Sequence, residues 1–371
     1  MSAKVCHLTS AHDSNDIRIF QKECVSIAEN NKFKVYLIAP GESRVEKCVT
    51  VIGIGDKPTN RLKRMTLFTR KLYKKAVELD ADIYHFHDPE LLSVGYKLKK
   101  MGKSVIFDSH EFTYEQIKIK TYIPKLFRYA IANLFYKKET KICRELDAVI
   151  FPCKVDGKNP FEGRCKKTVF INNLPKFNEF SNDENDNLKK EYDICHIGSL
   201  TAERGITEML EASKRGGFSV ILGGEFSSEE YRSSLEAKGL LENVNFVGYC
   251  SREDVVEYLK RSKIGISTIH RVGQYPLIEN LPTKVYEYMA MSIPVIISDF
   301  EYPKRLLAKY KFGISVDPSN AFEIYEAMKT LVRDTDMRLK MGHEGNKAIK
   351  EELSWEKEIE KLHALYEELC E

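Results

Sequence analysis

Two glutamates and a lysine in one short stretch have the residue types and spacing of a polar binding site. The stretch LIENLPTKVYEYMAMSIPVIISD, residues 277–299, predicts a loop, a helix and a buried strand. Glu279 falls in the loop, and Glu287 falls among apolar helix residues, where an unpaired carboxylate is costly. Lys284 shares a helical face with Glu287 and could pair with it. A structural ion pair and a polyol or phosphate site at the helix N-terminus are both open interpretations.

The glutamate spacing and the segment MAMSIPVIISD resemble the donor-site signature of retaining glycosyltransferases of family 4, which share the GT-B fold. The resemblance implies that Glu287 hydrogen-bonds the ribose of a nucleoside diphosphate sugar and that Glu279 faces the sugar. A carboxylate accepts two hydroxyl hydrogen bonds, and its charge strengthens both. Ser292 stands where many relatives have glycine, a departure that concerns the turn after the helix more than the chemistry of the site.

A second motif, IGSLTAERGI, follows the first strand of the second half and precedes a helix. At such a position backbone N–H groups and the helix dipole favour phosphate. The resemblance makes Arg204 the basic diphosphate residue. Ser199 replaces a family arginine, so one phosphate contact is either missing or taken over by Lys284. Three glycines would let the backbone approach the donor closely: Gly198, Gly223 and Gly224.

Polar residues at predicted strand ends in the first half form another candidate site, because ligands of open parallel sheets bind beyond the carboxyl ends of strands. The segments HDSNDIRIF, FHDPELL and VIFDSHE resemble N-domain segments of bacterial polysaccharide-forming family members. The resemblance makes His110 the histidine that touches the transferred sugar. Further candidates, which acceptor binding or a structural role would explain equally well, are His12, Asp13, His87 and Asp88.

A metal site is an alternative interpretation of the same region. His85, His87, Asp88 and His110 are hard or borderline ligands, and His85 and His87 would share one face of a strand. The resemblance implies that enzymes of this fold need no metal. We therefore expect no metal site and no cofactor besides the donor substrate.

Two domains of alternating strands and helices are needed to position these residues. The alternation runs through the first half, stops in an Asn-rich connector at 172–192, and then restarts. The prediction is an α/β chain of GT-B architecture, with two Rossmann-like doubly wound domains facing across a cleft. The first domain is expected to cover residues 1–175, with helix 354–371 packing back on it, and the second to cover 176–353.

Composition narrows the class of protein. The 371 residues are 43% hydrophobic, enough for two cores, and contain no run long enough to predict a transmembrane helix. Nine cysteines without a C-x-x-C pair argue against zinc ribbons and favour a reducing cytoplasm. Residues 1–175 carry 32 Lys and Arg against 20 Asp and Glu, a net +12, and the remainder carries a net −9.

Two segments of the basic half, 61–75 and 118–138, mix basic and apolar residues. They predict docking on an anionic membrane surface at the inner face of the cell membrane, although solvated helix faces would explain them too. Nucleic acid is not expected, because no recognised binding motif accompanies the charge.

The expected function is transfer, with retention, of a hexosyl or N-acetylhexosaminyl group from a nucleoside diphosphate sugar to an acceptor hydroxyl. A UDP-sugar is favoured over a GDP-sugar, and the acceptor is expected to be a glycan or lipid-linked sugar in surface polysaccharide assembly. Two alternatives stay open: a non-hydrolysing nucleotide-sugar epimerase, and a non-catalytic module that binds sugar nucleotides.

Overall fold

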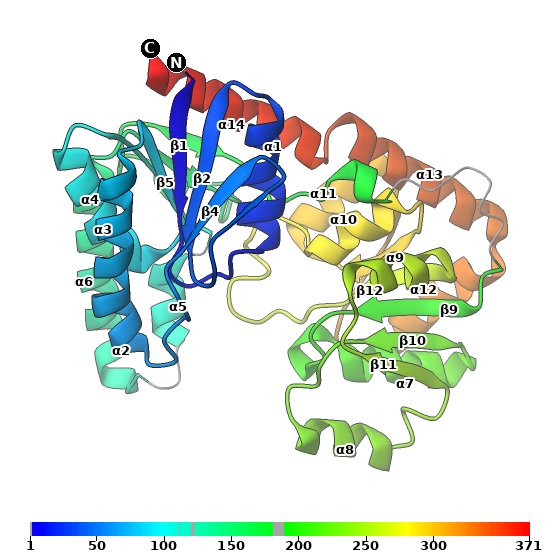
Figure 1. The fold of residues 1–371 in the computed structure, drawn as a ribbon. Coiled ribbons are helices and arrows are strands. Elements are labelled where there is room, and N and C mark those ends of the chain that lie inside the picture. The colour runs from blue at the N-terminus through cyan, green and yellow to red at the C-terminus, as the bar shows by residue number, and fades with distance from the viewer. Residues whose placement is uncertain (1, 111, 120–122, 181–188) are drawn as a thin grey trace. The chain divides into compact units, whose positions relative to one another are not determined.

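The chain forms two compact units, each built on one sheet (Figure 1). The computed structural model describes residues 2–110, 112–119, 123–180 and 189–371. Unit 1 comprises Met1–Asn173 and Glu356–Glu371, and unit 2 comprises Leu174–Trp355. Residues 120–122 of the second basic segment and 181–188 of the predicted connector lie outside the described residues.

Unit 1 contains an eight-stranded sheet in the order β3-β4-β2-β1-β5-β6-β7-β8. Neighbouring strands are parallel except β3 with β4. Its strands β5 and β7 are buried along their whole length, as parallel sheets require, and are apolar apart from His85 in β5. The strands are β1 (Ala3–Leu8), β2 (Phe33–Ala39), β3 (Arg44–Glu46), β4 (Val49–Gly53), β5 (Ile83–Phe86), β6 (Ser104–Asp108), β7 (Ala148–Phe151) and β8 (Thr168–Phe170).

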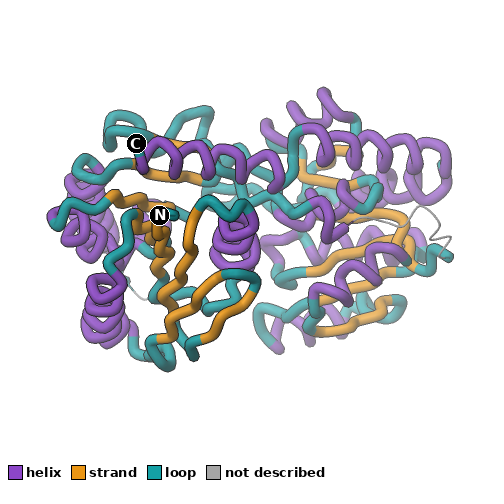
Figure 2. The backbone as a smooth tube through the Cα atoms, turned by 45° about the horizontal axis from the view of Figure 1, so that its top comes forward, coloured by secondary structure: helices purple, strands orange, loops and turns teal. Residues whose placement is uncertain are grey.

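Helices flank this sheet, and both termini of the chain belong to unit 1 (Figure 2). The first helix begins after Asp16, whose side chain accepts hydrogen bonds from the backbone N–H groups of Arg18 and Ile19. No described helix is long and apolar enough to cross a membrane. The helices are η1 (Ile17–Cys24, π-helical), α1 (Val25–Glu29), α2 (Arg61–Lys63), η2 (Arg64–Phe68), α3 (Thr69–Leu79), η3 (Pro89–Leu91), α4 (Leu92–Lys100), α5 (Thr113–Ile119), α6 (Lys125–Cys143) and α14 (Trp355–Cys370).

Unit 2 contains a six-stranded parallel sheet in the order β11-β10-β9-β12-β13-β14. This is the 3-2-1-4-5-6 order of a dinucleotide-binding fold, with its switch point between β9 and β12. Ligands of such sheets bind beyond the carboxyl ends of the strands at that point. The strands are β9 (Tyr192–Ile197), β10 (Val220–Gly223), β11 (Val244–Gly248), β12 (Ser262–Ser267), β13 (Val295–Ser298) and β14 (Gly313–Val316).

The helices of unit 2 alternate with these strands. Their bounds are η4 (Phe177–Phe180), η5 (Ala202–Arg204), α7 (Ile206–Gly216), α8 (Glu229–Ala237), α9 (Arg252–Lys260), α10 (Thr283–Ala290), α11 (Glu301–Tyr310), α12 (Ala321–Arg333) and α13 (Thr335–Glu351). The predicted α/β class and the two doubly wound sheets are confirmed. The sequence analysis did not predict the short antiparallel β3 or the helix α5.

The helix that carries Glu287 begins without a side-chain cap. Asparagine is a common helix cap, but Asn280 lies two residues before the cap position, which Pro282 occupies. The Asn280 side-chain oxygen instead accepts hydrogen bonds from Leu281 N and from the Tyr286 hydroxyl, at 2.9 and 2.7 Å. The amide therefore fixes the loop before α10 rather than the helix itself.

Ser292, after α10, has a left-handed backbone with φ of 56°. A Cβ in that conformation is strained, and glycine adopts it without strain. Ser292→Gly should therefore raise the free energy of unfolding by about 0.5 to 1 kcal/mol, measured by urea denaturation. Ser234→Gly, inside α8, is the matched control and should lower stability. Equal losses in both variants would contradict the argument.

Candidate functional site

Lys284 provides a half-buried positive charge in unit 2. It lies in the first turn of α10, and its Nζ is 2.9 Å from Nε2 of His196 in β9. His196 donates from Nδ1 to the carbonyl oxygen of Ile266, so its Nε2 is the acceptor for a proton of Lys284. Burial and then the positive charge of Lys284 lower the pKa of His196 well below its ordinary value, which keeps this ring neutral.

Two glycines form tight backbone turns beside Lys284: Gly198 faces the lysine, and Gly224 packs on Gly198. Gly198 follows β9 with φ of +140°, and a Cβ there would lie 2.7 Å from the Lys284 Nζ. Gly224 follows β10 with φ of +126°, and its Cβ would lie 1.9 Å from the Gly198 carbonyl oxygen. Gly198 N also donates to the Gly223 carbonyl oxygen at 2.9 Å. The turns after β9 and β10 therefore lie close to each other, and the close approach of this backbone to a donor stays a prediction.

Arg204 adds a second cation between β9 and α7. It is the last residue of η5, and its guanidinium lies 6.0 Å from the centroid of the Tyr275 ring. Its charge contributes to lowering the pKa of Lys284, so the two cations repel each other. An anion would relieve this repulsion, and the exposed Ser199 in the same turn provides a hydroxyl.

The pKa of Lys284 leads to a pH prediction. Burial and then Arg204 lower this pKa to about 7, so the ammonium loses its charge as the pH rises through 7. A diphosphate favours the charged form. Affinity for a nucleoside diphosphate should therefore be greatest below pH 7 and fall by up to about tenfold per pH unit above it. Calorimetry across pH would measure this.

Lys284→Met is the control for this prediction, because it removes the titrating group and should flatten the profile. A wild-type affinity that stays constant from pH 6 to about pH 9 would contradict the expectation that a titrating Lys284 contacts the nucleotide.

The ionic partner of Glu287 differs from the predicted one. Arg252, the first residue of α9, donates from Nη1 to Glu287 Oε1 at 2.6 Å, whereas Lys284 pairs with His196. The prediction of a Lys284–Glu287 pair is wrong because the lysine side chain extends toward β9. Arg252 also donates to Glu179 Oε2 at 3.0 Å, so one guanidinium joins two carboxylates. Glu287 itself is only 9% exposed.

Glu279 lies in the loop before α10, as predicted. Its carboxylate accepts a hydrogen bond from Nη2 of Arg305, in α11. The Glu279 side chain is 19% exposed and that of Arg305 is 53% exposed. The carboxylate is therefore held in place by a partner that remains open to solvent.

The Asp88 side chain holds the loop that follows β1. Its Oδ2 accepts hydrogen bonds from the backbone N–H groups of Ser10 and Ala11 and from the Thr9 hydroxyl, and its Oδ1 lies 3.0 Å from His12 Nδ1. Burial raises the pKa of Asp88, but His12 and these N–H groups outweigh burial and hold the pKa below its ordinary value. Asp88 therefore holds the loop after β1 as a carboxylate.

Asp13 differs from the other acceptor-side candidates. Its side chain is 81% exposed and pairs with Lys57 at 3.1 Å. It does not join the polar cluster formed by Asp88 and His12.

His110 belongs to a second polar group in unit 1. Its Nε2 lies 3.0 Å from Asp108 Oδ2 and 3.1 Å from His87 Nδ1. Arg18 holds the same carboxylate through Nε and Nη2, at 3.2 and 3.0 Å. The hydrogen bond to Asp108 fixes the proton of His110 on Nε2 and leaves Nδ1 as its acceptor.

A cavity of about 750 Å³ adjoins these histidines within unit 1. It combines polar groups at the strand ends with basic and apolar side chains from α2 to α6, which suits an anionic ligand with an apolar part. The polar residues at its base are His12, His87, Asp88 and His110. The cations in its lining are Arg61, Arg64, Arg70, Lys97 and Lys138, and the apolar residues include Met65, Leu92, Ile117, Ile123, Ile131 and Phe135.

The sequence analysis missed several residues that hold the predicted ones. Arg252 directly follows a strand and turn, so the same strand-end rule could have found it. His196 and Arg18 lie inside regular elements, and no local pattern distinguishes them from structural residues. The predicted candidates themselves fall into two sets, one in each unit.

Two family profiles match the chain. The profile for glycosyl transferases group 1 matches residues 177–348, and the profile for glycosyltransferase family 4 matches residues 27–158. The capsular polysaccharide biosynthesis glycosyltransferase CapM of Staphylococcus aureus is 21% identical over 184 residues, which is 48% of this chain and 47% of CapM. The chain spans less than half the length of the curated relatives that it matches.

Solved structures match over the whole chain. Sucrose-phosphate synthase from Thermosynechococcus elongatus has a TM-score of 0.76 at 15% identity, with 99% of each chain covered. The chain has the GT-B fold of glycosyltransferases. HepE of Anabaena, solved with UDP and glucose, shares this GT-B fold at a TM-score of 0.72 and 12% identity, covering 99% of this chain and 100% of HepE. Together with the two profiles, the fold supports a GT-B glycosyltransferase.

Proposed function

We propose that the chain transfers a hexosyl or N-acetylhexosaminyl group, with retention, from a nucleoside diphosphate sugar to an acceptor hydroxyl. The main observation in its support is the half-buried Lys284 beside Arg204 and the glycine turns of β9 and β10. These groups lie at the switch point of a dinucleotide-type sheet, where nucleotides bind. A UDP-sugar is the favoured donor, since HepE was solved with UDP.

In this proposal the diphosphate leaves under electrostatic stabilisation. The bond from the anomeric carbon to the phosphate oxygen breaks, and Arg204, Lys284 and backbone N–H groups of the turn before α7 stabilise the developing charge. The acceptor oxygen bonds to the same face of the carbon and gives its proton to the leaving phosphate. Glu287 binds the ribose, Glu279 the sugar, and no metal ion takes part.

A donor screen tests the proposal. The chain is incubated with UDP-, GDP-, TDP- and ADP-sugars, with and without oligosaccharide or lipid-linked acceptors, and the released nucleoside diphosphate is measured. Acceptor-dependent release from one donor class is the expected result. Formation of an epimerised sugar nucleotide without release would indicate an epimerase, and binding without either reaction would indicate a non-catalytic module.

We further propose that the acceptor is lipid-linked and that unit 1 docks on an anionic membrane at the cytoplasmic face, as in assembly of a surface polysaccharide. The basic and apolar lining of the 750 Å³ cavity supports this. Large apolar side chains also stand exposed on α2, η2 and α6, among basic residues: Leu62, Leu67, Leu126, Phe127 and Leu134. Each Lys or Arg near an anionic surface contributes about 1 kcal/mol, so four or five suffice for weak docking.

Sedimentation with liposomes checks the docking proposal. The chain should bind anionic vesicles, bind neutral ones less, and dissociate as salt rises. The double variant Leu126→Gln and Leu134→Gln should bind anionic vesicles at least about tenfold more weakly than the wild type. The reason is that two apolar side chains no longer enter the bilayer. Leu339→Gln, at an exposed leucine of α13, is the matched control. Absence of binding at low salt would refute docking but not transfer.

A further inference from the structure

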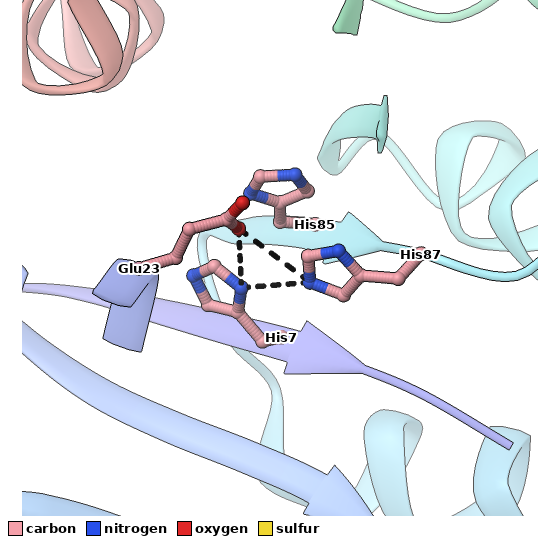
Figure 3. Close-up of side chains that lie close together, drawn as sticks. All are labelled: His7, Glu23, His85 and His87. Carbon is pink, nitrogen blue, oxygen red and sulfur yellow. Dashed lines mark hydrogen bonds and ion pairs between the residues drawn. The ribbon is translucent and has the colours of Figure 1, made fainter. Parts of the chain in front are cut away.

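Four buried polar side chains of unit 1 meet in one place (Figure 3). His7 comes from β1, Glu23 from η1, His85 from β5, and His87 from just beyond β5. None of the four is more than 1% exposed. The proposed transfer uses none of His7, Glu23 and His85. Such groups are costly to bury unless each finds a partner.

Three of their atoms form a triangle with the dimensions of a metal site. His7 Nδ1 lies 2.9 Å from His87 Nε2, and Glu23 Oε2 lies 3.7 Å from the first and 3.9 Å from the second. The point equidistant from three atoms with these separations lies about 2.1 Å from each, which is the Zn–N and Zn–O bond length. His85 offers a fourth ligand atom, and all four lie within 4.8 Å of one another.

The atoms that face away from this point are held by other groups. Glu23 Oε1 pairs with Arg18 Nε at 3.1 Å, and His87 Nδ1 lies 3.6 Å from the carboxylate oxygen Asp108 Oδ2. The Tyr366 hydroxyl lies 3.0 Å from His7 Nε2 and 2.6 Å from His85 Nδ1. Outer partners of this kind fix the ring orientation of metal-bound histidines.

Of the inner atoms, His7 Nδ1 and His87 Nε2 hydrogen-bond each other at 2.9 Å, whereas Glu23 Oε2 and His85 Nε2 have no hydrogen-bond partner in the described part of the chain. Glu23 Oε2 accepts no hydrogen bond within the described part of the chain, although it is buried. Arg18 pairs with Glu23 Oε1 through Nε at 3.1 Å and with Asp108 Oδ2 through Nη2 at 3.0 Å. The single guanidinium of Arg18 thus pairs with the carboxylates of both Glu23 and Asp108. A bound cation would supply the positive charge that the second carboxylate lacks.

A second set of possible ligands in unit 1 is less suited to a metal ion. Glu23, His87, Asp108 and His110 also bring ligand atoms together, but Asp108 Oδ2 already accepts hydrogen bonds from Arg18. An ion at that point would have to displace the guanidinium.

We propose that unit 1 binds one Zn²⁺-class divalent ion between His7 Nδ1, His87 Nε2 and Glu23 Oε2, with His85 as the fourth ligand. Mixed imidazole and carboxylate ligation at these separations suits Zn²⁺ among common biological metals. Four protein ligands make a closed, structural site, so the ion ties β1, η1 and β5 together and takes no part in transfer. His87 lines the 750 Å³ cavity and gives the ion a route of entry.

Co²⁺ titration of the chelator-treated full chain tests this proposal, because tetrahedral Co²⁺ absorbs strongly in the visible range. We expect saturation at one Co²⁺ per chain and displacement by Zn²⁺. Glu23→Gln should bind the ion at least about 100-fold more weakly, since a ligand matters more than its outer partners. His363→Gln, at a histidine of α14 outside the cluster, is the matched control and should bind as the wild type does.

A second variant covers the case in which Glu23→Gln fails to fold, as judged by circular dichroism. Tyr366→Phe keeps all four ligands and removes only the hydroxyl that orients two of them, so affinity should fall about 10- to 100-fold. The proposal is overturned if the folded wild type shows no saturable Co²⁺ absorption. Unchanged affinity in Tyr366→Phe, or in folded Glu23→Gln, would overturn it equally.

Discussion

His110→Ala should lower kcat by about 10²- to 10³-fold, the effect of removing one positioned polar group from a reacting centre. The affinity of the His110→Ala variant for a nucleoside diphosphate should equal that of the wild type. The reason is that all candidate nucleotide ligands, Lys284, Arg204 and Glu287, belong to unit 2, whereas His110 belongs to unit 1. The proposed role of His110 concerns the sugar, which the nucleoside diphosphate lacks.

Steady-state kinetics with the donor found by screening, and calorimetry with the nucleoside diphosphate, measure the two quantities separately. Glu279→Ala should behave in the same way, because it too is proposed to address the sugar. His363→Ala in the same unit is the control for nonspecific damage. Loss of nucleotide affinity in parallel with the loss of turnover would remove His110 from the proposed role.

Glu287→Ala should weaken nucleoside diphosphate binding by about 1.5 to 3 kcal/mol, or about 10- to 150-fold. The ribose hydroxyls would lose a charged acceptor, and Arg252 would lose the carboxylate that lies 2.6 Å from it. Because Arg252 keeps Glu179 at 3.0 Å, the variant should still fold.

Calorimetry at fixed pH below 7 keeps Lys284 charged and isolates the effect of Glu287. Glu279→Ala is the matched control, a carboxylate eight residues away that should leave this affinity intact. Glu287→Gln, which keeps an acceptor but not the charge, should fall between wild type and alanine. Affinity unchanged in Glu287→Ala would show that this carboxylate serves only the ion pair with Arg252.

The two sheets were predictable from sequence because each strand is specified by a pattern of consecutive residues. Apolar runs such as 295–298 and 104–108, each followed by polar residues and a helix pattern, specify buried parallel strands, and the structure has a buried strand at each of them. Short elements with little pattern were missed, as with the three residues of β3, whose pairing depends on β4. The glycine turns near Lys284 were also predictable, since strand ends and their order determine where such turns gather.

The side-chain partners of the site residues were not predictable from sequence, because they come from distant parts of the chain. The sequence by itself determined which carboxylates and cations are present and that strand ends would collect them. Only the tertiary structure paired Glu287 with Arg252, 35 residues away, and set Lys284 against His196, 88 residues away. It also placed Tyr366 of the last helix on His7 of the first strand. Side-chain spacing along a helix limits which neighbours are within reach, but the choice among them depends on packing between elements, which no local pattern encodes.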